Sequence, residues 1–82
     1  MKEVLKFSAA WCGPCQALSM TLKDIDDLDV VVKEIDIDDQ LDLAATYNIR
    51  SVPTLVVLQN GAEVRRKSGA LNKTQLKEFI ND

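Results

Sequence analysis

The two cysteines of the chain lie two residues apart, in the run Cys12-Gly13-Pro14-Cys15. A thiolate attacks a disulfide, and two thiols this close in sequence can bond to each other across one helical turn. A helix is expected to begin at Pro14, and a helix N-terminus favours an anion such as a thiolate. We therefore expect Cys12 to be the nucleophile that forms a mixed disulfide. Cys15 should be the resolving cysteine that releases the reduced substrate.

A zinc half-site and a purely structural disulfide are the alternatives for this cysteine pair. Structural zinc takes four ligands, whereas the sequence contains no histidine and no further cysteine. A disulfide across so short a loop would constrain the unfolded chain little. The lack of histidine also excludes Cys–His and Ser–His catalysis. We therefore favour redox chemistry at the pair and expect no metal site.

Length and composition predict one globular domain over residues 1–82, with 46% hydrophobic and 28% charged residues. The net charge of −3 disfavours nucleic-acid binding, and we interpret the basic run at 65–67 as the solvated edge of a hairpin. No stretch approaches the roughly 18 apolar residues of a membrane span, and the N-terminus lacks a secretory apolar run. We therefore expect a protein that binds neither nucleic acid nor membrane. We expect it in the cytoplasm, where thiols stay reduced.

Hydrophobic periodicity predicts the elements that must position the cysteines. Strands are expected at 4–7, 30–37, 54–58 and 63–67, and helices at 14 to about 28, 41–47 and 72–82. The run Val30-Val31-Val32 suggests that the second strand is buried on both faces. The order β-α-β-α-β-β-α predicts an α/β fold, with a four-stranded mixed sheet and helices on both faces.

Turn and cap residues support these boundaries. Asn60-Gly61 is typical of a two-residue hairpin turn. The last helix has the spacing of a capping box and of a hydrophobic staple, formed by Asn72 with Gln75 and by Leu71 with Leu76. Pro53 does not suit the interior of a central strand, so it must open the strand that follows or form a special turn. The acidic residues between 24 and 29 should end the first helix in solvent.

Four segments of the sequence resemble the thioredoxin family, in the family's order. They are Trp11-Cys12-Gly13-Pro14-Cys15 after a strand, Val52-Pro53-Thr54, Asn60-Gly61, and Ser68-Gly69-Ala70-Leu71 with the helix that follows. The resemblance implies a thioredoxin-like fold and the reduction of protein disulfides. It implies a cis Val52–Pro53 bond and a substrate-binding surface of Trp11, Gly13, Pro14, Val52, Pro53, Gly69 and Ala70. It also implies a monomer without a bound cofactor, which receives electrons from NADPH through a separate thioredoxin reductase.

The chain also departs from the family's pattern. The family usually has a further strand and helix before the first strand seen here, so this chain resembles a short, minimal thioredoxin, and the sheet edge left open should be covered or charged. The family's buried aspartate before the cysteines is replaced by Lys6, and its partner lysine by Glu34. We expect Lys6 and Glu34 to form an ion pair beneath Cys15 that relays protons or tunes the thiols. The alternative is that both side chains point to solvent.

Three functions are consistent with these features. A thioredoxin-type protein-disulfide reductase fits best. A glutaredoxin-like, glutathione-dependent reductase is the nearest alternative, although Gly13-Pro14 resembles thioredoxin more closely. The third is a binding subunit of a larger enzyme, in which the cysteines would have no redox role.

Overall fold

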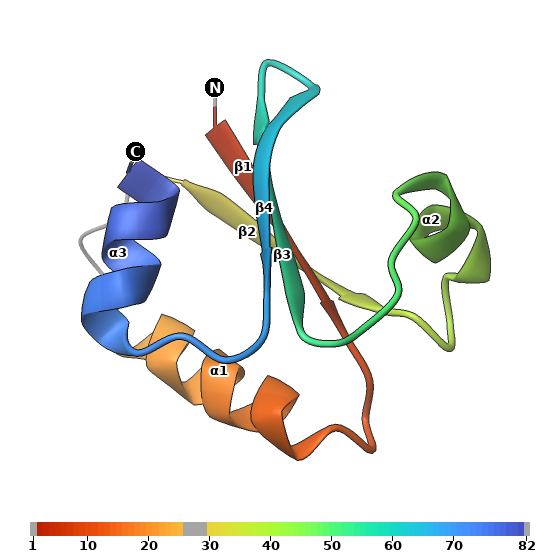
Figure 1. Cartoon of the computed structure of the whole chain (residues 1–82), viewed down its shortest axis with the longest axis horizontal. Coiled ribbons are helices and arrows are strands. Elements are labelled where there is room, and N and C mark those ends of the chain that lie inside the picture. The colour runs from red at the N-terminus through yellow and green to blue at the C-terminus, as the bar shows by residue number, and fades with distance from the viewer. Residues whose placement is uncertain (1, 26–29, 82) are drawn as a thin grey trace.

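The computed structural model describes residues 2–25 and 30–81 (Figure 1). Along the chain these residues form β1 (Lys2–Ser8), α1 (Gly13–Lys23), β2 (Val31–Asp36), α2 (Leu41–Thr46), β3 (Thr54–Gln59), β4 (Ala62–Ser68) and α3 (Lys73–Asn81). The predicted order β-α-β-α-β-β-α is therefore confirmed. None of the helices in these two ranges is both long enough and apolar enough to span a bilayer.

The four strands form one mixed sheet in the order β2-β1-β3-β4. Strand β1 is parallel to β2 and antiparallel to β3, and β3 is antiparallel to β4. Figure 1 shows α1 and α3 on one side of the sheet and α2 on the other. In this thioredoxin-like α/β architecture, the parallel strands β1 and β2 end on the same side of the sheet. The cysteine loop follows β1 and therefore lies on that side.

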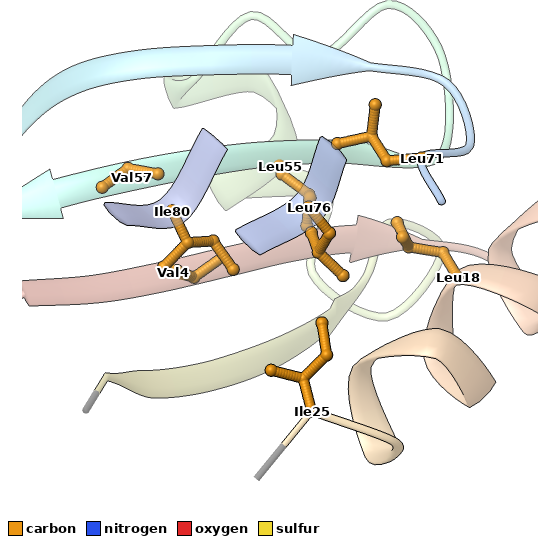
Figure 2. Packing of buried hydrophobic residues seen from close by; sticks show 8 residues of the cluster. All are labelled: Val4, Leu18, Ile25, Leu55, Val57, Leu71, Leu76 and Ile80. Carbon is orange, nitrogen blue, oxygen red and sulfur yellow. The ribbon is translucent and has the colours of Figure 1, made fainter. Parts of the chain in front are cut away.

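The larger hydrophobic core lies between the sheet and the helices α1 and α3. Its buried members, shown in Figure 2, are Val4, Leu18, Ile25, Leu55, Val57, Leu71, Leu76 and Ile80. Alternate residues of β1 and β3 point to this face, as the period of a strand requires. Burial of each such aliphatic side chain stabilises the fold by about 1.5–3 kcal/mol.

The opposite face of the sheet packs against α2. Leu5, Phe7, Ile35, Val56 and Leu58 are buried there, with Leu43, Tyr47 and Ile49 packed against them. The rings of Phe7 and Tyr47 are 5.6 Å apart between centroids. Strands β1 and β3 are thus covered on both faces, which explains why β3 carries the continuous apolar run Leu55-Val56-Val57-Leu58.

The prediction that the second strand is buried on both faces is wrong. Strand β2 is an edge strand, and Val31 and Val32 each remain 40% exposed. The strand is also one residue shorter at each end than the predicted 30–37. A run of valines favours a strand but does not fix the position of that strand in a sheet.

The predicted turns and caps are present. Asn60 and Gly61 both have positive φ, 54° and 86°, as a two-residue hairpin turn of this type requires. In the capping box, the Asn72 side chain accepts from the Gln75 N–H at 2.8 Å and the Gln75 side chain accepts from the Asn72 N–H at 3.0 Å. Helix α1 ends at Lys23, with exposed Asp24 as its C-cap. The same expectation for the acidic residues within 26–29, that they end the helix in solvent, concerns positions outside the described residues.

Candidate active site

Cys12 and Cys15 are joined by a disulfide at the start of α1. Their Cα atoms are 5.2 Å apart. Cys12 is the N-cap residue of the helix, and its Sγ accepts a hydrogen bond from the Cys15 N–H at 3.1 Å. Pro14 occupies the first turn, where the helix needs no hydrogen bond from its nitrogen. A sulfur atom thus occupies the place of a capping oxygen, where helix N–H groups and the positive end of the helix dipole favour negative charge.

Both cysteines are buried, and they differ in their position along α1. Cys12 is 5% exposed and follows the exposed Trp11, whereas Cys15 is 2% exposed and lies one turn into the helix. Ala9 completes this cluster, and Ile37 and Val52 pack against it. Cys15 is therefore part of the protein interior.

Trp11 stands beside the disulfide and is 69% exposed. Its indole N–H donates to the Asp38 carboxylate at 3.0 Å, and the Asp38 N–H donates to the Asp36 carboxylate at 2.8 Å. Asp38 was not among the site residues predicted from the sequence. A signal was available, because the carboxyl ends of parallel strands meet at one edge of a sheet. Because β1 and β2 are parallel, the residues that follow β2 lie next to those that follow β1.

The Val52–Pro53 and Gly69 loops meet next to the cysteines. The Val52–Pro53 bond is cis, as the family resemblance implies. Gly69 has a φ of 94° and donates its N–H to the Pro53 carbonyl at 2.9 Å. Since Val52 packs against the cysteine cluster, the structure brings these two loops to the disulfide. Ala70, Gly13 and Pro14 are exposed neighbours of these residues in the chain.

Lys6 and Glu34 form the expected ion pair. They are register partners in β1 and β2, and Lys6 Nζ lies 2.8 Å from Glu34 Oε1. Lys6 is only 2% exposed whereas Glu34 is 62% exposed. The alternative that both side chains point to solvent is therefore wrong for Lys6. Ser19 joins the pair: its Oγ accepts from Lys6 Nζ and donates to Glu34 Oε1 at 3.2 Å.

Ser19 was missed by the sequence analysis, although it lies four residues after Cys15 and therefore on the same helix face. The hydrogen bond from Lys6 is the main reason that the pKa of Glu34 is lowered from 4.5, with the Lys6 charge and Ser19 adding to it and partial burial opposing it. Glu34 is therefore a carboxylate at neutral pH.

An open cavity of about 420 Å³ is lined both by this polar network and by Cys15. Its lining consists of Lys6, Ser8, Ala9, Ala10, Cys15, Gln16, Ser19, Glu34 and Asp36. In the two described ranges, no cluster of three or more histidine, cysteine, aspartate or glutamate side chains could hold a metal ion. The Cys12–Cys15 disulfide itself supports the exchange of disulfides for thiols at this site.

Comparisons with known proteins agree with this geometry. A sequence model of the family called Thioredoxin matches residues 1–82. Thioredoxin from Mycoplasma genitalium is 40% identical over 81 residues, covering 96% of this chain and 79% of that protein. Thioredoxin from Haemophilus influenzae is 38% identical over 81 residues, covering 95% and 76% respectively.

Solved structures show the same similarity in three dimensions. A mutant thioredoxin from Halobacterium salinarum has a TM-score of 0.92 at 36% identity, covering 98% of this chain and 72% of its own. Oxidised mitochondrial thioredoxin 3 from Saccharomyces cerevisiae has a TM-score of 0.88 at 32% identity, covering 99% and 77%. The match in sequence and fold makes this chain a member of the thioredoxin family, a thiol–disulfide oxidoreductase that acts on protein disulfides through Cys12 and Cys15.

Proposed function

We propose that the chain is a general cytoplasmic protein-disulfide reductase, active as a monomer, whose dithiol form is regenerated by a thioredoxin reductase with electrons from NADPH. The observation that carries the proposal is the Cys12–Cys15 disulfide at the N-terminus of α1, with Cys12 Sγ already hydrogen-bonded to the helix backbone. Membership of the thioredoxin family supports the choice of reductase and of protein substrates.

The reaction consists of two exchanges of sulfur–sulfur bonds. The Cys12 thiolate attacks a substrate disulfide, forms a mixed disulfide and expels one substrate thiolate, which takes a proton from solvent. Cys15 then loses its proton to solvent and attacks Cys12 Sγ, which releases the second substrate thiolate. The substrate gains two electrons and two protons, and Cys12 and Cys15 return to the disulfide. The position of Cys15 one turn into α1, where it is the less exposed of the two cysteines, supports its role as the resolving cysteine.

The substrate would bind across the loops that meet at the disulfide. Trp11 offers an exposed aromatic face, with Gly13 and Pro14 beside Cys12. Among the residues that the structure describes, the backbone N–H and C=O of Val52 take part in no hydrogen bond. They are therefore available to pair with an extended substrate segment, in the manner of an added strand. Pro53, Gly69 and Ala70 would form the other wall of this substrate surface.

Insulin reduction coupled to NADPH oxidation tests the proposed activity. The wild-type protein should reduce insulin with thioredoxin reductase, Cys12→Ser should be inactive, and Cys15→Ser should accumulate a mixed disulfide. Activity with glutathione alone would identify a glutaredoxin-like enzyme instead. Unchanged binding of a partner by a Cys12→Ser/Cys15→Ser protein, without insulin reduction by the wild type, would identify a binding subunit.

A matched pair of variants tests the substrate surface. Trp11 and Met20 are both 69% exposed, and Met20 lies two turns further along α1 from Cys12. Trp11→Ala should raise the KM for insulin several-fold, with little effect on the reduction of a small aromatic disulfide. Met20→Ala should alter neither reaction. An equal effect of the two substitutions on KM would contradict the proposed surface.

A further inference from the structure

Lys6 is a buried charge that the exchange reaction described above does not use. Its ammonium group carries three N–H donors. One donates to Ser19 Oγ and one to Glu34 Oε1. The third has no acceptor among residues 2–25 and 30–81, so it is available to a group in the cavity. Because Cys15 lines that same cavity, a thiolate formed on Cys15 is the group that this free donor and positive charge would favour.

Ser19 lies between the charges of this network. Its hydroxyl accepts from Lys6 and donates to Glu34 at 3.2 Å, so it links both side chains to α1, the helix that also carries Cys15. Ser19 and Cys15 are four residues apart and share one face of the helix. Ser19 thus connects the Lys6 ammonium to the helix that carries Cys15.

The other charges near the cavity do not cancel the effect of Lys6. From β2, Glu34 and Asp36 contribute carboxylates, and from α1, Lys23 adds a positive charge that acts on Glu34. Glu34 is 62% exposed, so water screens its charge, whereas Lys6 is 2% exposed. The Asp36 carboxylate accepts the N–H of Asp38. The buried ammonium is thus the least screened of the charges that line the cavity together with Cys15.

We propose that Ser19 is a positioning residue for the resolving step. It holds the Lys6 ammonium at the wall of the cavity shared with Cys15, where this positive charge stabilises the Cys15 thiolate. The proposal rests on the resolving role given to Cys15 above. An electrostatic role predicts opposite effects for the two charges. Removing the charge of Lys6 disfavours the Cys15 thiolate, whereas removing the charge of Glu34 favours it.

The test measures the thiolate of Cys15 directly, in a Cys12→Ser background, by ultraviolet absorbance and by the rate of alkylation against pH. At a pH on the rising part of this titration curve, Lys6→Met should lower the fraction of Cys15 present as thiolate by about tenfold. Ser19→Ala should lower it by a smaller factor, and Ser19→Thr, which keeps the hydroxyl, should restore it. Glu34→Gln should raise it. Lys33→Met is the matched control and should have no effect. Lys33 precedes Glu34 in β2, is exposed, and pairs with Glu3 of β1.

Opposite shifts for Lys6→Met and Glu34→Gln would support an electrostatic role, because structural damage has no reason to depend on the sign of the charge removed. The proposal is overturned if Lys6→Met leaves the titration unchanged, if the two shifts have the same sign, or if Ser19→Ala behaves like the wild type. Ser19→Ala keeps the test decisive should another variant unfold, since alanine is the best helix former. Insulin reduction by the wild type reports on the proposed function separately, so failure of one does not imply failure of the other.

Discussion

Removal of the two members of the Lys6–Glu34 ion pair should affect stability unequally. Glu34→Gln leaves the ammonium of Lys6 buried without its carboxylate partner, which is the costly way to break such a pair. Lys6→Met removes the buried charge itself and fills the space with an apolar chain of similar length. The remaining Glu34 is exposed to water and needs no partner. We therefore expect Glu34→Gln to be the more harmful substitution.

The burial of the pair sets the size of the difference. Breaking a fully buried pair costs about 3–5 kcal/mol, and an exposed pair contributes about 0.2–1 kcal/mol. Because the carboxylate is 62% exposed and water screens it, we expect a loss of about 1–2 kcal/mol for Glu34→Gln. For a domain of this size that corresponds to a Tm lower by about 4–16 °C. Lys6→Met should lie within about 1 kcal/mol of the wild type, or above it.

The pH dependence follows from the lowered pKa of Glu34. The hydrogen bond from Lys6 lowers this pKa below its usual value of 4.5, so the unfolded chain binds the proton more tightly than the folded one. The stabilisation is complete above about pH 4.5 and is lost as the pH falls through the folded pKa. The advantage of the wild type over Glu34→Gln should therefore shrink with acidification over that window.

Urea unfolding of the oxidised protein, followed by circular dichroism, measures these differences. Lys33→Met removes the more exposed Lys33–Glu3 pair and serves as the control, with an expected loss below about 1 kcal/mol. A larger loss for Lys6→Met than for Glu34→Gln would refute the reasoning, as would a difference between wild type and Glu34→Gln that does not change with pH.

Three further substitutions test other parts of the structure. Leu76→Ala removes a fully buried side chain of the larger core and should cost about 2–5 kcal/mol in urea unfolding, so a loss below about 1 kcal/mol would contradict the described packing. Asn72→Ala removes the cap of α3 and should cost about 0.5–2 kcal/mol, whereas Asn72→Asp should largely keep the stability. Asp38→Ala releases the indole of Trp11, the single tryptophan, and should lower its fluorescence anisotropy. The variant Asp38→Asn keeps an acceptor oxygen and should not.

Most of the fold could be predicted from local sequence features. The hairpin turn follows from Asn60-Gly61, because both residues tolerate positive φ. The start of α3 follows from the side chain of Asn72, which can cap the helix. The exposure of Val31 and Val32 could not be predicted in this way. It depends on the place of β2 at the sheet edge, which is set by tertiary pairing and not by the strand's own residues.

The candidate site also has parts that could be predicted from local sequence and parts that depend on tertiary contacts. Cys12 and Cys15 form a local motif, so their closeness at a helix start could be predicted from their spacing. The ion pair of Lys6 with Glu34 was expected only by comparison with the family pattern. Ser19 belongs to no motif. It joins the network because α1 packs on the face of β1 to which Lys6 points, a contact that only the folded chain reveals.

The central claim is that Cys12 provides a stabilised thiolate at the start of α1. Its most direct test is the rate of iodoacetamide alkylation of the fully reduced protein against pH, with the modified cysteine identified by mass spectrometry. We expect that Cys12 alone reacts at neutral pH, with a midpoint below the value of about 8.5 for a free cysteine. Cys15 should remain protected. A midpoint at or above that value, or faster labelling of Cys15 than of Cys12, would show that Cys12 does not provide a stabilised thiolate.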